Sequence, residues 1–333
     1  MKRYRIVSLA IAATSLLMSV GQAVPRAHAE SAAYNLSMNW FPEPEEGGYY
    51  YADHMGLYKK YGINTTIRIF GYSVNPFADV LSGKIAFAMG NADEVLQYRS
   101  RGAPLVAIMN TFQTNPQGFL WHAEDKSIHS LADFSNHTII YSFGAGFFPY
   151  LQKHYHWTNI KTRNYDFTSR AFALDPKAVN QCYVTSEPYV WGKQGLKVKY
   201  ALIASSGYDP YGDLIVTTES MVKNHPDLVK AFVKASVEGW SSYLKDPTAI
   251  NKYLPSAPGA RNFPMKPDEI AFDFNQVKRL KLVDGGDAAT HGIGYFSLAR
   301  WKTLQQQLVS TGQKVGQVDV SKAFTNQFLP GKM

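Results

Sequence analysis

Aromatic and polar side chains gather at the ends of segments whose pattern predicts β-strands. Trp40 ends the first such segment and Phe41 follows it, Asn91 follows another, and Glu187 directly precedes a predicted helix. In open α/β sheets, ligands bind beyond the carboxyl ends of strands, where loops lead into helices. Aromatic rings can stack on a flat ligand while amides and carboxylates fix its orientation, so the pattern favours a small-molecule cleft. The residues that we expect to bind the ligand are Asn39, Trp40, Phe41, Tyr49, Asn91, Thr111, Gln113, Phe143, Gly144, Tyr183 and Glu187.

Several of these side chains also have a purely structural interpretation. Trp40 could be a core residue, because tryptophan is intermediate in burial, and Phe41 and Tyr49 could pack a helix against a sheet. Glu187 stands before Pro188 in the first turn of a predicted helix, where the helix dipole favours a carboxylate. Asn39 could satisfy backbone groups rather than a ligand.

The loop Gly144-Ala145-Gly146 offers a different kind of chemistry. It follows a predicted strand and opens a predicted helix that runs to about His154. Backbone N–H groups at the start of a helix attract anions. A sulfonate or a similar oxyanion is therefore an alternative ligand, and an arginine or lysine in the cleft would support it.

Motifs for catalysis, cofactors and metals are weak or absent in this sequence. Gly144-x-Gly146 lacks the third glycine of a dinucleotide fingerprint, and no Gly-x-Ser-x-Gly nucleophile elbow occurs. His154 and His156 are two residues apart, so on a helix they point to different faces. Cys182 is the single cysteine, so it has no intramolecular disulfide partner. We expect no cofactor, no metal and no enzymatic activity.

The elements that position these residues alternate between strand and helix. Strands are predicted at residues 34–40, 63–70, 85–89 and 105–109, with helices at 46–61, 76–81 and 92–101 between them. A second alternating set has strands at 119–122, 137–141, 163–167, 179–184 and 199–203, and helices at 130–134, 144–154 and 188–194. A strand at 214–218 and helices including 226–244 and 298–309 complete the chain. Such alternation is typical of a mostly parallel sheet with flanking helices.

Chain length and the two alternating sets predict two lobes. About 300 residues exceed the usual size of a single core. We expect residues 30–115 and 213–333 to form lobe I and residues 116–212 to form lobe II. The crossings near 113–118 and 204–213 contain Gly, Pro or Ser, the composition of a hinge. The predicted fold class is therefore α/β, two-lobed, with a ligand cleft between the lobes.

The first 29 residues have the pattern of a secretory signal peptide. Three basic residues among the first five precede an apolar run at 6–20, and Ala27-His28-Ala29 offers a cleavage site. The apolar run is shorter than the roughly 20 residues of a membrane span. No cysteine lies near the cleavage site for a lipid anchor. We expect a freely diffusing periplasmic protein.

The charge of the chain is mild once the predicted signal peptide is set aside. Four of the 34 basic residues lie within residues 1–29, which leaves 30 basic against 26 acidic residues, a net charge of +4. Lysines and arginines are scattered without a run of five or six like charges, so no nucleic-acid partner is expected.

Five segments of the chain carry recognisable motifs: NWFPEP with GGYY (39–50), GLYKKYGI (56–63), LSGKIAFA (81–88), RGAPLVA (101–107) and YVTSEP (183–188). Together they resemble the periplasmic binding proteins related to thiamine pyrimidine synthesis. Ala86 stands where the family usually has Asp. The family includes receptors for formyl-aminopyrimidine and riboflavin, and its wider relatives bind taurine, alkanesulfonates and nitrate.

This resemblance implies a type 2 receptor fold and a monomeric, substrate-binding component of an ABC importer. It implies that the lobes close around the ligand and dock on an inner-membrane permease, that Trp40 stacks on a flat ring, and that Glu187 accepts N–H groups of an amino-heterocycle such as an aminopyrimidine precursor of thiamine. Some relatives are pyrimidine-synthesising enzymes with a cysteine-rich motif, which the lone Cys182 does not match.

Overall fold

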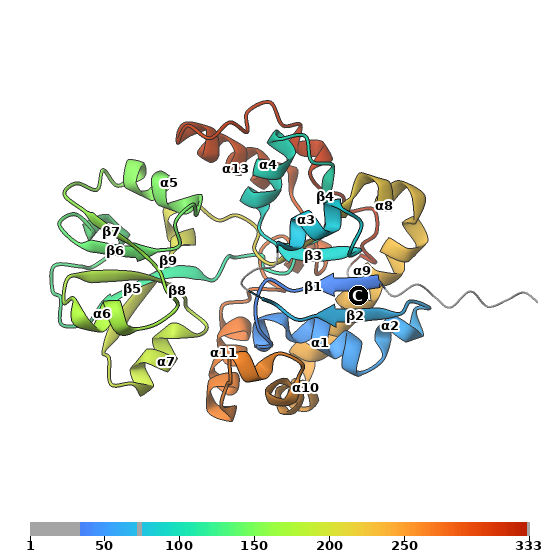
Figure 1. Ribbon diagram of the computed structural model, residues 1–333, viewed down its shortest axis with the longest axis horizontal. Helices are drawn as coiled ribbons and strands as arrows, with labels where there is room; N and C mark the ends of the chain where they lie inside the picture. Colours follow the sequence, from blue (N-terminus) through green and yellow to red (C-terminus); the bar gives the residue numbers. More distant parts are fainter. Residues whose placement is uncertain (1–33, 72–74, 332–333) are drawn as a thin grey trace, which may run out of the picture. The chain divides into compact units, whose positions relative to one another are not determined.

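The first sheet combines strands from the N-terminal part of the chain with one strand from beyond its middle. The computed structural model describes residues 34–71 and 75–331 (Figure 1). The order is β2-β1-β3-β10-β4, with β1 at Tyr34–Ser37, β2 at Thr65–Arg68, β3 at Phe87–Gly90, β10 at Leu214–Thr218 and β4 at Leu105–Met109. β1 pairs in parallel with β2 and β3, whereas β10 runs antiparallel to β3 and β4.

Both faces of this sheet are buried, because side chains alternate between two apolar clusters. Val106 and Ile108 of β4 join one cluster, and Leu105 and Ala107 join the other. The first cluster packs against α1 (Gly47–His54) and α9 (Pro226–Lys245), which approach each other closely. A Cβ atom on Gly48 would lie 2.2 Å from the Trp240 ring, so this approach requires glycine.

The other helices around the first sheet are mostly short. They are α2 at Leu57–Lys60, α3 at Pro76–Leu81, α4 at Ala92–Ser100, α8 at Glu219–Asn224, α10 at Thr248–Tyr253, α11 at Pro267–Arg279, α12 at Ala288–His291 and α13 at Leu298–Ser310. Single-turn 3-10 helices also occur: η1 at Pro44–Glu46, η4 at Leu254–Ser256, η5 at Ala260–Asn262 and η6 at Val320–Lys322.

The second sheet repeats the plan of the first. Its order is β7-β6-β8-β5-β9, with β5 at Gln117–His122, β6 at Thr138–Tyr141, β7 at Lys161–Asn164, β8 at Ala178–Tyr183 and β9 at Val198–Leu202. β6 pairs in parallel with β7 and β8, and β5 is antiparallel to β8 and β9. Its helices are η2 at Leu131–Asp133, α5 at Phe147–His154, α6 at Arg170–Leu174, α7 at Glu187–Lys193 and η3 at Ile203–Ser206.

Two of the predicted helices are corrected by the structure. The helix predicted at 46–61 is divided into η1, α1 and α2, because Gly56 adopts a φ of 72°, which ends a right-handed helix. The helix predicted from Gly144 begins at Phe147, since Gly144 has a φ of 93°. Each sheet also contains one antiparallel strand, β10 or β5, where the chain enters from the other sheet.

Two chain segments connect the sheets, and they pair with each other. We call the part of the chain built on the first sheet lobe I and the part built on the second sheet lobe II. The segments run from β4 to β5 and from β9 to β10, and Phe112 N donates a hydrogen bond of 3.0 Å to Gly212 O between them. The lobe boundaries predicted at 115/116 and 212/213 fall within these segments and stay predictions.

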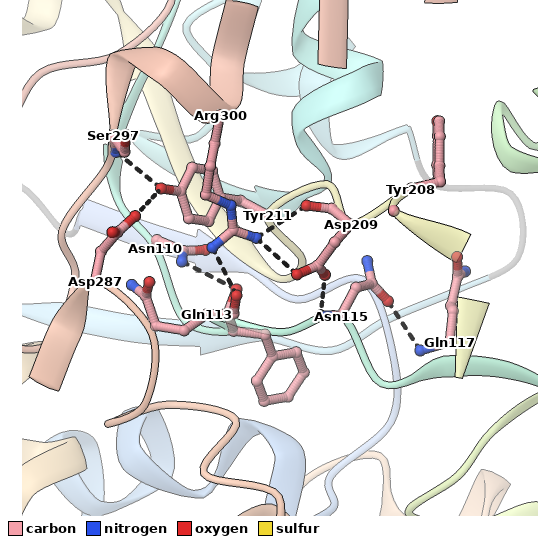
Figure 2. Close-up of polar contacts among 12 residues, drawn as sticks. Asn110, Gln113, Asn115, Gln117, Tyr208, Asp209, Tyr211, Asp287, Ser297 and Arg300 are labelled. Carbon is pink, nitrogen blue, oxygen red and sulfur yellow. Dashed lines mark hydrogen bonds and ion pairs between the residues drawn. The ribbon is translucent and has the colours of Figure 1, made fainter. Parts of the chain in front are cut away.

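Arg300 of α13 joins both connecting segments, as Figure 2 shows. Its guanidinium donates to Gln113 O at 2.7 Å in the first segment and to Asp209 O at 2.9 Å in the second. It also pairs with Asp209 Oδ2 at 3.2 Å and lies 3.9 Å from the Tyr211 ring centroid. One side chain of lobe I therefore holds both connections in place.

Within the described ranges, no helix is long and apolar enough to cross a membrane. The signal peptide predicted at residues 1–29 lies outside the described residues.

Candidate ligand-binding site

A cavity of about 780 Å³ lies between side chains of the two lobes. Its size is in the usual range for small-molecule sites. Lobe I contributes the ends of β1 and β3, η1 and the start of α4, while lobe II contributes the end of β8 and the start of α7. These are ends of strands where loops lead into helices, as the sequence pattern predicts.

One wall of the cavity is aromatic. The Trp40 ring lies 5.4 Å from Phe70, 5.7 Å from Phe263 and 5.3 Å from Phe167, measured between ring centroids. Trp40 follows β1 in lobe I, and Phe167 follows β7 in lobe II, so the wall is assembled from both lobes. Phe167 has a φ of 59°, an unusual value for a bulky residue that is often found at functional sites.

Another part of the cavity is acidic. Six carboxyl side chains line it: Glu43, Glu45, Glu46, Glu94, Glu187 and Asp213. Lysine, arginine and histidine are absent from the described residues that line it. Three of the six come from η1 and its cap, where Pro44 occupies the first helical position and Glu43 N donates to Glu46 Oε2 at 3.2 Å.

Burial makes these carboxyls weak acids. Desolvation raises the pKa of Glu45 to about 8, although hydrogen bonds, including one donated by the Thr185 hydroxyl, oppose the shift. Desolvation and neighbouring carboxylates raise the pKa values of Glu43 and Glu46 well above the ordinary value. Desolvation also raises the pKa of Asp213 to about 6. Ionised carboxylates without a cation are costly in such surroundings.

Asp213 and Asn39 form a polar pair at the edge of the acidic part. Asn39 Nδ2 donates to Asp213 Oδ1 at 2.7 Å. Asp213 is 2% exposed and has a φ of 48°, a left-handed conformation that Asp tolerates better than most residues. The second connecting segment therefore delivers a carboxyl directly into the cavity.

Glu187 is held in place by two hydrogen bonds within lobe II. Its carboxylate accepts from Tyr165 Oη at 2.9 Å and from Tyr183 N at 2.8 Å. It begins α7, where the helix dipole favours negative charge, while burial raises its pKa. Since each carboxylate oxygen has two acceptor sites, Glu187 retains capacity for a ligand.

The structure brings some of the predicted ligand-binding residues to the cavity and places the others elsewhere. Those that line it are Asn39, Trp40, Asn91, Tyr183 and Glu187. The ones outside the lining are Phe41, Tyr49, Thr111, Gln113, Phe143 and Gly144. Ligand contact by any of them stays a prediction.

The residues outside the lining have structural partners or face solvent. Phe41 is buried behind Trp40 and lies parallel to Phe263, with 5.9 Å between centroids. Tyr49 and Thr111 are fully buried and share a hydrogen bond of 2.6 Å. These side chains are buried within lobe I, and their contact with a ligand stays a prediction.

Gln113, Phe143 and Gly144 lie outside the lining for different reasons. Gln113 Nε2 donates to Tyr295 O at 3.0 Å, beside the connecting segments. Phe143 is 57% exposed and Gly144 is also exposed, in the loop before α5. The loop proposed as an anion site is therefore not part of this cavity.

Sequence reasoning missed most of the acidic part. Glu43, Glu45 and Glu46 stand in a short stretch with two prolines, which resembles a solvated turn. The only sequence pattern that could have indicated them is that these three glutamates follow closely after Trp40. Asp213 was hidden because it lies in a segment interpreted as a hinge. Phe70, Phe167 and Phe263 come from three separate loops, which no local pattern connects.

Comparison with known proteins identifies the family of this chain. A family model described as NMT1/THI5 like matches residues 43–250. The chain belongs to this family. It is 26% identical over 328 residues to the riboflavin-binding protein RibY of Chloroflexus aurantiacus, an alignment that covers 92% of this chain and 89% of RibY. It is 20% identical over 274 residues to the formylaminopyrimidine-binding protein of Halalkalibacterium halodurans, covering 80% of this chain and 82% of that protein.

Solved structures share the two-lobed fold. The periplasmic aliphatic sulphonate binding protein SsuA of Escherichia coli superposes with a TM-score of 0.68 at 14% identity, covering 90% of this chain and 94% of that one. SsuA of Xanthomonas axonopodis pv. citri, bound to MOPS, has a TM-score of 0.64 at 12% identity, covering 90% and 99%. The predicted fold, a two-lobed periplasmic-binding-protein fold, is confirmed.

Proposed function

We propose that this protein is the substrate-binding receptor of an ABC importer, and that its cavity takes a small, flat, nitrogen-containing heteroaromatic ligand such as an aminopyrimidine. The observation that carries the proposal is the pairing of an aromatic wall around Trp40 with carboxyls that face the same cavity. A flat ring can stack on the wall, and its N–H groups can donate to the carboxyls. The named ligands of the two relatives, riboflavin and formylaminopyrimidine, are of this chemical class.

The sulfonate alternative has less support from the cavity. An anion needs lysine, arginine or backbone N–H donors, and the described lining residues include six carboxyls and no basic side chain. The loop at Gly144 lies outside the lining. The likeness to sulfonate-binding structures, at 14% identity or less, concerns the fold alone.

A catalytic role also has less support. Cys182 lines the cavity, but it is 1% exposed and its burial raises the pKa of the thiol well above the ordinary value. A thiol in that state is a poor nucleophile. Among the described residues, no group of acidic, histidine and cysteine side chains is arranged to hold a metal ion.

As a receptor, the protein would bind by movement of the lobes about the two connecting segments. It would act in the periplasm as a monomer and deliver its ligand to an inner-membrane permease. Contacts between the lobes already flank the cavity: Tyr189 Oη of α7 donates to Asp268 Oδ2 of α11 at 3.0 Å, and Lys193 pairs with the same carboxylate at 3.1 Å.

The proposal is tested by calorimetry with an aminopyrimidine, riboflavin and an alkanesulfonate, on the wild type and matched variants. Trp40→Ala should weaken heteroaromatic binding about tenfold or more, because it removes a stacking ring. Glu187→Gln should weaken binding about tenfold, because it removes a charge-assisted acceptor. The control variants are Tyr200→Ala, an exposed aromatic outside the lining, and Glu124→Gln, an exposed carboxylate outside it.

Unchanged heteroaromatic affinity in both cavity variants would overturn the site. Binding of the alkanesulfonate alone would overturn the ligand class.

A further inference from the structure

Three buried acceptor oxygens of residues that line the cavity have no hydrogen-bond partner among the described residues. The lining residues with a buried polar atom that has no hydrogen-bond partner within the described chain are Asn39, Glu43 and Asn91, and in each case the atom is an oxygen. The fully buried side-chain donors without a partner, such as the Trp121 indole N–H, belong to residues outside the lining. Buried acceptors are normally satisfied in native structures. A ligand that brings donors would satisfy these oxygens.

Of these three residues, Glu43 has the greatest need of a hydrogen-bond donor from the ligand. It is 3% exposed, and its Oε2 atom accepts no hydrogen bond from an N–H or hydroxyl donor of the described residues, so that its side-chain contact is with the neighbouring Glu45 carboxyl. The nearby carboxyls of Glu45, Glu46 and Asp273 repel the charge of Glu43. A neutral donor would satisfy one lone pair, whereas a cation would also relieve this repulsion.

We propose that the ligand is held as a cation, a flat ring whose protonated or ammonium nitrogen lies among Glu43, Glu46 and Asp213 while its face packs on Trp40. The inference rests on the receptor function proposed above and narrows its ligand class. An aromatic wall supports it independently, because the face of a tryptophan ring attracts a cation through its quadrupole. The absence of basic side chains from the described lining residues leaves the ligand as the source of positive charge.

Cation binding at this site is coupled to proton release. The carboxyls of Glu45 and Asp213, with pKa values raised by burial to about 8 and about 6, hold protons in the empty cavity near neutral pH or just below it. The titratable groups that face them are carboxyls and phenols: Glu43 and Glu46 of η1 and its cap, Glu94 of α4, Asp273 of α11, Glu187 of α7, Tyr49 of α1 and Tyr183 of β8. None of these becomes positively charged. A bound cation lowers the carboxyl pKa values and expels protons, so cation affinity rises with pH.

Three compounds that share one ring test the proposal. They are 2-methylpyrimidin-4-amines with a 5-aminomethyl, 5-hydroxymethyl or 5-carboxyl group, which at pH 8 are a cation, a neutral molecule and an anion. Calorimetry on the full-length protein should give an affinity about tenfold to a hundredfold higher for the aminomethyl than for the hydroxymethyl compound. The carboxyl compound should show no binding. Titration of the aminomethyl compound in two buffers of different ionisation enthalpy at pH 7 should report release of up to about one proton.

Two variants, Glu43→Gln and Glu124→Gln, test whether the positive charge of the ligand lies beside Glu43. Glu43→Gln should reduce the affinity for the aminomethyl compound about tenfold and change the affinity for the hydroxymethyl compound less than about twofold. Glu124→Gln should change neither. Equal or tighter binding of the hydroxymethyl compound by the wild type would overturn the cationic ligand and leave the receptor function standing. Failure of all three compounds and of riboflavin to bind would overturn the proposed function, and the cationic ligand with it.

Discussion

Arg300 offers a sharp test of how the connecting segments are held. Replacing it with alanine removes the two hydrogen bonds to Gln113 O and Asp209 O, the ion pair with Asp209 and the contact with the Tyr211 ring. Burial raises the pKa of Asp209 and Arg300 lowers it, so the variant also leaves a half-buried carboxylate without its cation.

The expected loss can be worked from these contacts. A hydrogen bond from a charged donor contributes about 1.5–3 kcal/mol, but the Arg300 side chain is 25% exposed and that of Asp209 is 28% exposed, so solvent screens part of the pair. The freed carbonyls also regain water. We expect Arg300→Ala to destabilise the protein by about 2–3 kcal/mol, which corresponds to a fall in Tm of about 3–5 °C for a chain of this size.

The assay is thermal unfolding of the ligand-free protein followed by tryptophan fluorescence. Arg300→Lys keeps the charge but loses the planar fork that reaches two carbonyls, so it should recover only about half of the loss. Lys302→Ala, an exposed lysine of the same helix with no ion pair among the described residues, is the matched control and should shift Tm by less than about 1 °C. If Arg300→Ala were as stable as this control, the contacts of Arg300 would not stabilise the protein. If Arg300→Lys recovered the full loss, the planar guanidinium would have no special role.

Two other changes test the packing of α1 against α9 and the ionisation of Glu45. Gly48→Ala places a Cβ atom 2.2 Å from the Trp240 ring and should destabilise the protein by about 1–3 kcal/mol in urea unfolding, whereas Gly192→Ala, with open space around its Cβ position, should not destabilise it. Equal effects would contradict the close approach of α1 and α9. Because burial raises the pKa of Glu45 to about 8, its contribution to the stability of the ligand-free protein is present below its unfolded-state pKa and is lost as pH rises toward 8. Tm should therefore fall between about pH 5 and pH 8, and Glu45→Gln should flatten that dependence; an unchanged slope would show that Glu45 does not titrate there.

Local sequence patterns were enough to predict the helices and strands whose limits depend on their own residues. The predicted helix at 76–81 matches α3, because Asn75 caps its start and accepts a hydrogen bond from Ala78 N. The strands predicted at 105–109 and 214–218 match β4 and β10, since apolar runs of this length suit a strand buried on both faces. The antiparallel direction of β10 was not predictable, because strand direction depends on where the chain returns from.

The candidate site was predicted only where one short segment carries it. Asn39 and Trp40 directly follow β1, and Glu187 begins α7, so strand and helix ends were sufficient to place them. Tyr49, on a predicted helix, and Thr111, after a predicted strand, lie outside the lining, because neither position reveals whether a side chain turns to the core or to the cavity. The carboxyls of η1 were missed because their burial depends on α11 and lobe II, which are distant in sequence.

The central claim, that the cavity captures a flat nitrogen heteroaromatic, is tested most directly by the small molecules that the protein carries. Protein purified under native conditions would be denatured, and the released compounds identified and quantified by mass spectrometry, in parallel with Trp40→Ala and Tyr200→Ala. We expect one flat nitrogen heteroaromatic at close to one equivalent from the wild type and from Tyr200→Ala, and a strongly reduced amount from Trp40→Ala. A stoichiometric sulfonate, or a heteroaromatic retained in full by Trp40→Ala, would contradict the central claim.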